Sequence, residues 1–168
     1  MRICVALLLA TATATSAAAQ DPGWRLTPEG YGPIRIGMSR AQVARIVGAP
    51  LEGEEHTEGC IVAHSARGWS GMWFMFEQGR LSRVSISARS RVTTPRGVGV
   101  GASETAVRRA YPRGLQVEPH HYEGLPGRYL TFWLRPNARG VRFETDRTRR
   151  VRTIHAGGPS ILYVEGCL

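Results

Sequence analysis

Two stretches of the sequence, GPIRIGMSRAQVARIVG at residues 32–48 and RGVGVGASETAVRRAYP at residues 96–112, align with each other without a gap. Both carry the pattern apolar-x-apolar-Gly-x-Ser, followed by apolar residues at helical spacing. The matched positions are Ile34 and Val98, Ile36 and Val100, Gly37 and Gly101, Ser39 and Ser103, and Val43 and Val107. A serine placed in this way accepts hydrogen bonds from the free N–H groups of a helix's first turn. We therefore predict two helices, capped by Ser39 and Ser103.

The glycine-rich run GVGVGA at residues 97–102 also fits the G-x-G-x-x-A fingerprint of a dinucleotide-binding loop. That fingerprint follows a buried apolar strand, and its early glycines allow a pyrophosphate to approach closely. The preceding stretch, SARSRVTTPR at residues 87–96, is polar and basic, and the first copy has proline and arginine in place of the first two glycines. We therefore interpret the run as the start of a helix and not as a nucleotide site.

A later pair of segments keeps the same order, because FMFEQGRLSRVSIS at residues 74–87 resembles VRFETDRTRRVRTIHA at residues 141–156. Shared order and spacing indicate an internal duplication of a unit of about 65–70 residues. The first unit is expected at residues 21–92 and the second at residues 93–168. Alternating apolar and polar residues after each helix predict antiparallel strands with one buried face, the last of them at residues 161–164.

The expected fold class is therefore α+β, built from two tandem repeats. Each repeat is expected to be a short N-terminal helix, or helix pair, packed on a three- to four-stranded antiparallel sheet. One helix covers one face of such a small sheet, so the other face is expected to stay open. An open sheet face is a natural surface for a partner.

The first 20 residues, MRICVALLLATATATSAAAQ, combine an early arginine, an apolar run and a small-residue region. This layout predicts a secretory signal peptide at residues 1–20. The apolar run is much shorter than the roughly 20 residues that a membrane span needs. No cysteine follows it at the cleavage region, so a lipid anchor is not expected. We expect a periplasmic or secreted protein that does not span the membrane.

Two cysteines remain after the expected cleavage, Cys60 and Cys167. In an oxidising compartment a lone pair favours a disulfide. The alternative is a redox-active dithiol, although such pairs usually lie close together as C-x-x-C. The formal net charge is +9, and every positive side chain is an arginine. Because the whole chain lacks lysine, we interpret the arginines by position and not by type.

The segment IRIGMSRAQVARIVGAP at residues 34–50 resembles the opening motif I-x-x-G-M-[ST]-x-x-x-V-x-x-x-[LV]-G-x-P of the BamE-like fold. Two such units in tandem, exported and carrying a disulfide, are similar to the β-lactamase inhibitory proteins. The resemblance implies a non-catalytic module whose open sheet face binds a protein partner in the cell envelope. It transfers no inhibitor contact residues to this chain.

Four aromatic residues are the candidates for binding such a partner. Trp69 and Trp73 flank an expected turn, and Tyr129 and Trp133 share one face of an expected strand. Each could instead belong to the core, but a unit with a single helix cannot bury both sheet faces. Exposed tryptophan and tyrosine side chains commonly anchor binding.

The stretch DRTRRVR at residues 146–152 concentrates positive charge and suggests an alternative function. Its candidate anion-binding residues are Arg147, Arg149, Arg150 and Arg152. They could attract a lipid head group or a wall polymer, or they could protect a solvated strand edge from aggregation. Export argues against nucleic acid as the partner.

Catalytic and metal-binding patterns are weak. The chain has two aspartates, Asp21 and Asp146, and GWSGM at residues 68–72 lacks the G-x-S-x-G spacing of a nucleophile elbow. Adjacent histidines such as His120 and His121 would point to opposite faces of a strand, and the other three show no ligand spacing. We expect a protein that is not an enzyme and that holds no metal or cofactor.

Overall fold

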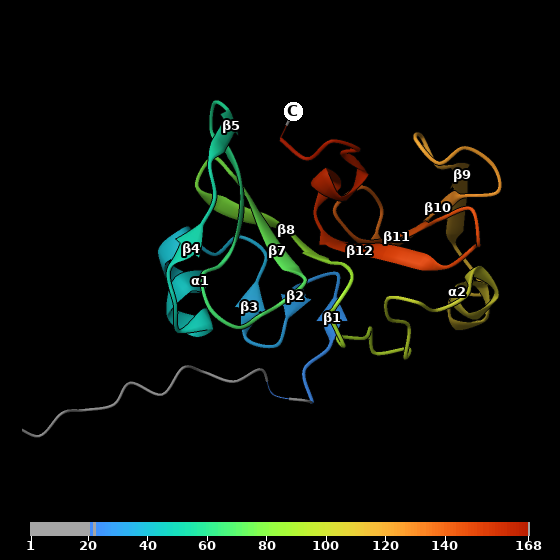
Figure 1. Cartoon of the computed structure of the whole chain (residues 1–168), viewed down its shortest axis with the longest axis horizontal. Helices are drawn as coiled ribbons and strands as arrows, with labels where there is room; N and C mark the ends of the chain where they lie inside the picture. The colour runs from blue at the N-terminus through green and yellow to red at the C-terminus, as the bar shows by residue number, and fades with distance from the viewer. Residues whose placement is uncertain (1–20, 22, 168) are drawn as a thin grey trace, which may run out of the picture.

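An antiparallel sheet of nine strands dominates the computed structural model, which describes residues 21 and 23–167 (Figure 1). In chain order its strands are β4 (Leu51–Glu52), β5 (Glu55–Thr57), β6 (Cys60–Ser65), β7 (Met72–Glu77), β8 (Arg80–Ile86), β9 (Leu115–Pro119), β10 (Arg128–Arg135), β11 (Arg139–Thr145) and β12 (Val151–Gly157). Across the sheet, eight strands follow the order β4-β6-β7-β8-β12-β11-β10-β9, and β5 also pairs with β6.

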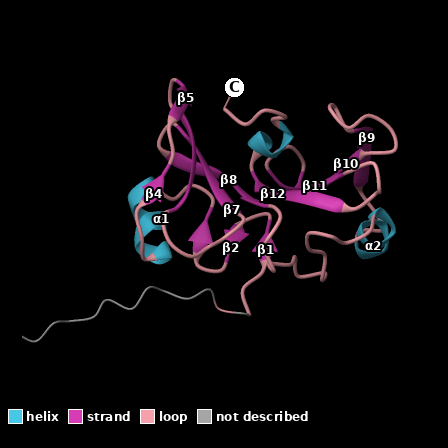
Figure 2. Cartoon of the chain, in the orientation of Figure 1, coloured by secondary structure: helices cyan, strands magenta, loops and turns pink. Residues whose placement is uncertain are grey.

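A smaller sheet and two α-helices lie on one side of the large sheet. The small sheet contains β1 (Leu26–Thr27), β2 (Gly30–Tyr31) and β3 (Ile34–Arg35), and the helices are α1 (Arg40–Val47) and α2 (Glu104–Ala110). The helices lie toward opposite ends of the large sheet, with the small sheet between them (Figure 1). A short 3₁₀-helix, η1 (Pro159–Leu162), lies on the other side (Figure 2).

The core fills the space between the large sheet and this helical layer. Period-2 alternation sends one set of strand residues to this side, and the helices contribute residues such as Val43, Val47 and Val107. The strand residues of the core include Phe74 and Phe76 of β7, Leu81, Val84 and Ile86 of β8, Val151, Ile154 and Ala156 of β12, Val141 and Phe143 of β11, and Leu130 of β10.

The two helices start in the same way. The Ser39 hydroxyl accepts from the Gln42 N–H in a capping box, and the Ser103 hydroxyl accepts from the Ala106 N–H. Just before each cap, the glycine N–H donates to the first core residue of a strand: Gly37 to the Leu81 carbonyl at 2.7 Å, and Gly101 to the Val151 carbonyl at 2.8 Å. Gly101 has a φ of +87°, where a side chain would be strained. The glycine run therefore starts a helix and fastens it to the sheet.

The expected fold class of two separate helix-on-sheet repeats is wrong. Strand β8 pairs with β12, with Ile86 opposite Ile154 and Val84 opposite Ala156, so strands from both parts of the chain form one sheet. The three-stranded sheet of β1–β3 was not expected either. Alternation in the sequence places strand residues on a face, but it does not specify which strand edges meet. Pairing β8 with β12 removes two exposed edges that would otherwise invite aggregation.

Three further expectations concern the first 20 residues, the domain boundary and the last strand. The signal peptide at residues 1–20 lies outside the described residues, and the division of the chain at residues 92 and 93 stays a prediction. The strand expected at residues 161–164 is instead the end of η1 followed by a bend at residues 164 and 165. In the described part of the chain, no helix is long and apolar enough to cross a membrane.

Candidate functional site

The face of the large sheet opposite the helices, called the second face below, is closed in two different ways. Residues 158–167, called the tail, follow β12 and include η1. The η1 part packs on β8, β12 and β11, where Ile161 lies against Gly140. The rest of the tail covers the second face over β6 and β7. Gly166 of the tail lies against Val62 and Met75, whose methyl carbons are 3.6 and 3.8 Å from where a Cβ on that glycine would stand. Over β9–β12, polar side chains of the sheet itself fill the face.

Arg83 holds the tail on the sheet. This side chain of β8 is buried, and its Nη1 donates to the carbonyls of Ser160 at 2.9 Å and Tyr163 at 3.3 Å. Burial lowers the pKa of Arg83 to about 10, and the neighbouring Glu144 and Glu77 act in the opposite direction. The guanidinium therefore keeps its charge at neutral pH and remains a donor. On the outer side of the tail, the Tyr163 hydroxyl donates to Glu77 at 3.0 Å.

A disulfide between Cys60 and Cys167 ties the end of the tail to β6, as predicted. The Thr57 hydroxyl of β5 donates to the Cys167 carbonyl. Cys60 lies opposite Glu77 in the β6–β7 ladder, so the disulfide and the Tyr163 hydrogen bond fasten the tail at neighbouring points. The tail is thus a fixed part of the second face.

A buried polar cluster occupies the second face on the other strands. The Ser85 hydroxyl of β8 lies 2.7 Å from Nδ1 of His155 on β12, and Nε2 of His155 lies 3.1 Å from Oε1 of Glu144 on β11. Next to them, the Arg142 guanidinium lies 3.8 Å from the centre of the Tyr129 ring. The sheet register creates this cluster, because Ser85 and Arg142 lie directly opposite His155 on the two neighbouring strands.

Burial and charge set the protonation of this cluster. Burial lowers the pKa of His155, and the hydrogen bond with Glu144 offsets only part of this effect. Burial alone would raise the pKa of Glu144, but its hydrogen bond and Coulomb attraction to His155, with further attraction to His120 and Arg142, lower the pKa overall. At neutral pH the favoured state is a neutral imidazole beside an ionised carboxylate.

Serine, histidine and carboxylate in this order resemble the components of a nucleophilic site. Ser85 is only 6% exposed and His155 only 8% exposed. A substrate could not reach the hydroxyl without opening the face. The cluster therefore fills the second face with hydrogen-bonded polar groups, as buried polar atoms require.

A surface pocket of about 580 Å³ lies where the tail meets the rest of the second face. Residues 163–167 of the tail form one side, and Cys60 and Glu77 of β6 and β7 contribute from the sheet. Thr57 of β5 completes this side. His121 and Tyr122, from the loop between β9 and β10, also line it. Its volume is in the range typical of ligand pockets.

Exposed apolar side chains concentrate around this pocket. Of seven large apolar side chains that are well exposed among the described residues, five belong to the tail or to the β9–β10 loop: Tyr122, Leu125, Leu162, Tyr163 and Val164. Three of these, Tyr122, Tyr163 and Val164, line the pocket directly. Clustered exposed apolar surface is typical of binding sites, whereas scattered single residues are not.

The four aromatic candidates do not form one surface. Trp69 is 6% exposed and lies in the core, where its indole N–H donates to the Val47 carbonyl, and Tyr129 is 4% exposed beneath Arg142. The prediction of Trp69 and Tyr129 as exposed docking residues is therefore wrong. Trp73 and Trp133 do lie on the second face, but four strand spacings, or about 19 Å, separate their strands.

The residues that do gather at the pocket were not candidates. Tyr122 lies in a polar loop, and Tyr163 and Val164 were assigned to a strand. For Tyr163 and Val164, the available sequence signal is that they lie a few residues before Cys167, which the disulfide holds in place. That signal becomes useful only when the path of the tail is known.

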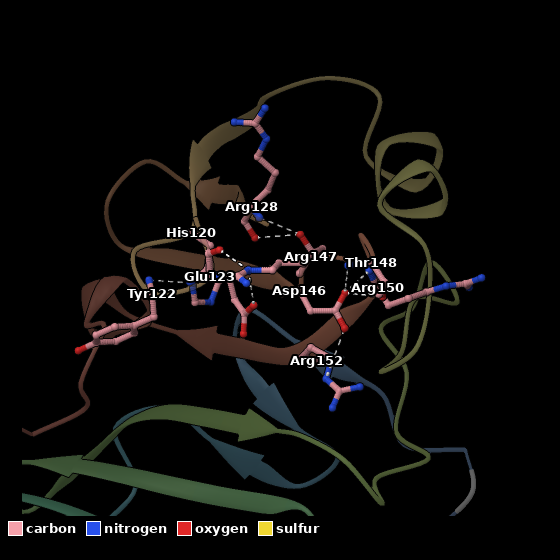
Figure 3. Close-up of polar contacts among 10 residues, drawn as sticks. His120, Tyr122, Glu123, Arg128, Asp146, Arg147, Thr148, Arg150 and Arg152 are labelled. Carbon is pink, nitrogen blue, oxygen red and sulfur yellow. Dashed lines mark hydrogen bonds and ion pairs between the residues drawn. The ribbon is translucent and has the colours of Figure 1, made fainter. Parts of the chain in front are cut away.

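The arginine side chains of residues 146–152 make separate contacts, and Figure 3 shows Arg147, Arg150 and Arg152 pointing in different directions. Arg147 Nε donates to the Glu123 carbonyl at 2.9 Å, Arg152 pairs with Asp146 at 3.7 Å, and Arg150 Nη1 donates to the Gly101 carbonyl at 3.2 Å. Arg149 is exposed at a turn position with a φ of +57°. The structure therefore brings these arginines into one turn but not into one convergent anion site. Within the described residues, no cluster of His, Cys, Asp and Glu could hold a metal ion.

No protein-family model matches the chain, and no curated protein matches it. A solved structure that the chain resembles is an extracellular protein containing an SCP domain from Bacillus anthracis str. Ames. The TM-score is 0.52 at 9% sequence identity, and the match covers 88% of this chain and 50% of that one. The chain thus spans about half the length of that protein. At this identity the likeness shows a shared fold alone.

Proposed function

We propose that the chain is an exported, non-catalytic binding module that recognises a protein partner at the pocket between the tail and the β9–β10 loop. The observation that carries the proposal is the concentration of exposed Tyr122, Tyr163 and Val164 around this pocket. Large exposed aromatic side chains next to a concave surface are the usual anchors of protein recognition. The disulfide between Cys60 and Cys167 supports export, because such bonds persist in oxidising compartments. The signal peptide predicted at residues 1–20 agrees with this proposal of a periplasmic or secreted protein.

The pocket is suited to binding because its walls are fixed before a partner arrives. Arg83, the disulfide and the Tyr163–Glu77 hydrogen bond hold the tail. The β9–β10 loop is held in its middle, at Glu123, by contacts with Arg147. A pre-organised surface loses little conformational entropy on binding. The resemblance to the BamE-like fold and to the β-lactamase inhibitory proteins also implies a non-catalytic protein-binding module and stays a prediction. The open sheet face expected with it is closed by the tail and the polar cluster, so the proposed surface is the pocket instead.

The test compares two variants of the mature protein. Tyr122→Ser/Val164→Ser removes two exposed side chains from the pocket, and Leu134→Ser removes an equally exposed apolar side chain from outside it. Proteins captured from envelope extract by the wild type are identified, purified and titrated by calorimetry. We expect the first variant to weaken binding of a captured partner by about tenfold or more and the second to change it by less than about twofold. Equal loss in both variants, or no loss in either, would refute the proposed surface.

A further inference from the structure

The charge of the pocket is opposite to that of the protein. The chain carries 22 basic residues, all arginine, against 13 acidic ones. Among the described residues, the pocket is nevertheless lined by two carboxylates, Glu77 and Glu165, and by no arginine. The overall positive charge of the protein would attract an anionic partner. The carboxylates of the pocket would instead attract a cationic group.

The two carboxylates are placed for different contacts. Glu77 already accepts the Tyr163 hydroxyl with Oε1, and this hydrogen bond with the carboxylate raises the pKa of Tyr163. Arg83 lies behind the tail and partly balances Glu77 from the sheet side. Glu165 is exposed on the tail, one residue from the glycine that rests on the sheet. The uncompensated negative charge of the pocket is therefore mainly that of Glu165.

Aromatic faces accompany these carboxylates. The side chains of Tyr122 and Tyr163 are 58% and 44% exposed, and both line the pocket. Tyr122 comes from the β9–β10 loop and points away from the Arg147–Glu123 contact (Figure 3). A cation over the face of a tyrosine ring is attracted by the negative potential of the ring. A planar guanidinium can stack on such a ring and also bond a carboxylate in two places, whereas an ammonium ion cannot do both equally well.

We infer that the pocket binds the guanidinium of an arginine side chain on the partner protein, between Glu165 and the rings of Tyr122 and Tyr163. This inference rests on the proposed function and names the chemistry of the partner. An acidic pocket on a basic protein also restricts how a partner can dock. The partner's arginine is repelled by the positive surface elsewhere and attracted only at the pocket, and this difference fixes the orientation of the complex.

The direct test uses N-acetyl-arginine methylamide as the probe and the full mature protein, disulfide intact. Its neutral isostere, N-acetyl-citrulline methylamide, is the matched control. We expect saturable shifts of the Tyr122 and Gly166 amide signals in two-dimensional NMR spectra, with a dissociation constant on the order of 1 mM, and no saturation with citrulline. Equal responses to the two probes would overturn the inference. A lysine probe that binds as tightly as the arginine probe would overturn the assignment to a guanidinium.

Two variants locate the charge. Glu165→Gln should weaken the arginine probe by about fivefold or more, because it removes the uncompensated carboxylate. Glu54→Gln removes an exposed carboxylate outside the pocket and should leave the affinity unchanged. Equal weakening by both variants would mean general attraction without a site, and would refute the inference.

The same variants separate this inference from the proposed function. A captured partner whose affinity falls with Tyr122→Ser/Val164→Ser but not with Glu165→Gln would leave the docking surface standing and refute the cationic group. Self-association of the wild type that Glu165→Gln abolishes would identify the occupant as an arginine of a second copy, and would refute a separate partner.

Discussion

The two parts of the second face are shielded from water in different ways. Over β6–β8 the sheet presents Val62 and Met75, and the chain returns to cover them with its tail. Over β11 and β12 the sheet presents Arg142, Glu144 and His155, and these side chains pair with one another. The first part is closed by a separate segment, and the second mainly by its own side chains, with η1 packed beside Gly140 at one end of β11. The pocket lies where the first kind of closure ends.

The difference shows where this fold can bind. A self-paired polar cluster leaves few groups free for a partner, since its donors and acceptors are already used. A covering segment ends in an exposed rim, and the rim here carries Tyr163, Val164 and Glu165. We therefore expect a partner to bind at the part of the second face that the tail covers. The following predictions test this comparison.

The largest effect is expected from the disulfide. Replacing Cys60 and Cys167 with serine frees the end of the tail and opens a loop whose ends are 107 residues apart. The free energy of unfolding should fall by about 4–5 kcal/mol on the chain-entropy model. Guanidinium denaturation of the variant and of the oxidised wild type measures the difference. The variant's midpoint should not respond to a reductant, whereas that of the wild type should; coincident midpoints of variant and oxidised wild type would contradict the role given to the tail.

A smaller loss is expected from Arg83→Met, which leaves the Ser160 and Tyr163 carbonyls without their donor. An unsatisfied buried polar group costs about 1–3 kcal/mol. Denaturation measures the loss, and limited proteolysis should show earlier cleavage within residues 158–167. Arg80→Met is the control, because Arg80 is on the same strand but exposed. If Arg80→Met costs as much as Arg83→Met, the assigned anchor is wrong.

Acid should act on the self-paired part. In the native state the pKa of His155 lies below its ordinary value of 6.5. Below about pH 6.5 the unfolded chain therefore binds a proton at this histidine that the native state does not bind. The free energy of unfolding consequently falls as the pH decreases. The lowered pKa of Glu144 adds a further loss below about 4.5, in the same direction. Both effects develop only on acidification. We expect His155→Gln to flatten the fall in melting temperature as pH decreases from about 6.5 to about 5, where the unfolded chain takes up a proton on an ordinary histidine.

The control for that series is His64→Gln, since His64 is a partly exposed histidine on the second face, outside the cluster. Its melting curve should keep the acid slope of the wild type. An unchanged slope in His155→Gln would show that acid acts elsewhere in the molecule.

The smallest effect is expected at the arginine-rich turn, which belongs to neither part. Arg149→Ser removes an exposed guanidinium and should change stability by less than about 0.5 kcal/mol, as ordinary surface substitutions do. Melting temperatures at low and high salt measure the change. A loss that is larger at low salt than at high salt would indicate that the turn stabilises the fold through charge, contrary to the small effect expected.

Local features of the fold could be predicted from the sequence. A serine two residues after a glycine marks each helix, and alternation marks strands such as β8, because both signals depend on neighbouring residues. The pairing of Cys60 with Cys167 followed from there being just two cysteines after the expected cleavage. The pairing of β8 with β12 could not be predicted, since alternation leaves the edge partner undefined. The pocket could not be predicted either, because it depends on a tail that returns across β6.

The pairing of β8 with β12 has a consequence for how the molecule opens. The small sheet lies beneath this junction, with contacts from β1 to β12 and from β2 to β8, and the Leu26 N–H donates to the Thr93 carbonyl. Pulling the halves apart would expose Val84 and Ala156 along two bare edges. Amide hydrogen exchange in β7 and in β11 should then report a single cooperative opening with the same free energy. Either half produced alone would expose an edge prone to aggregation.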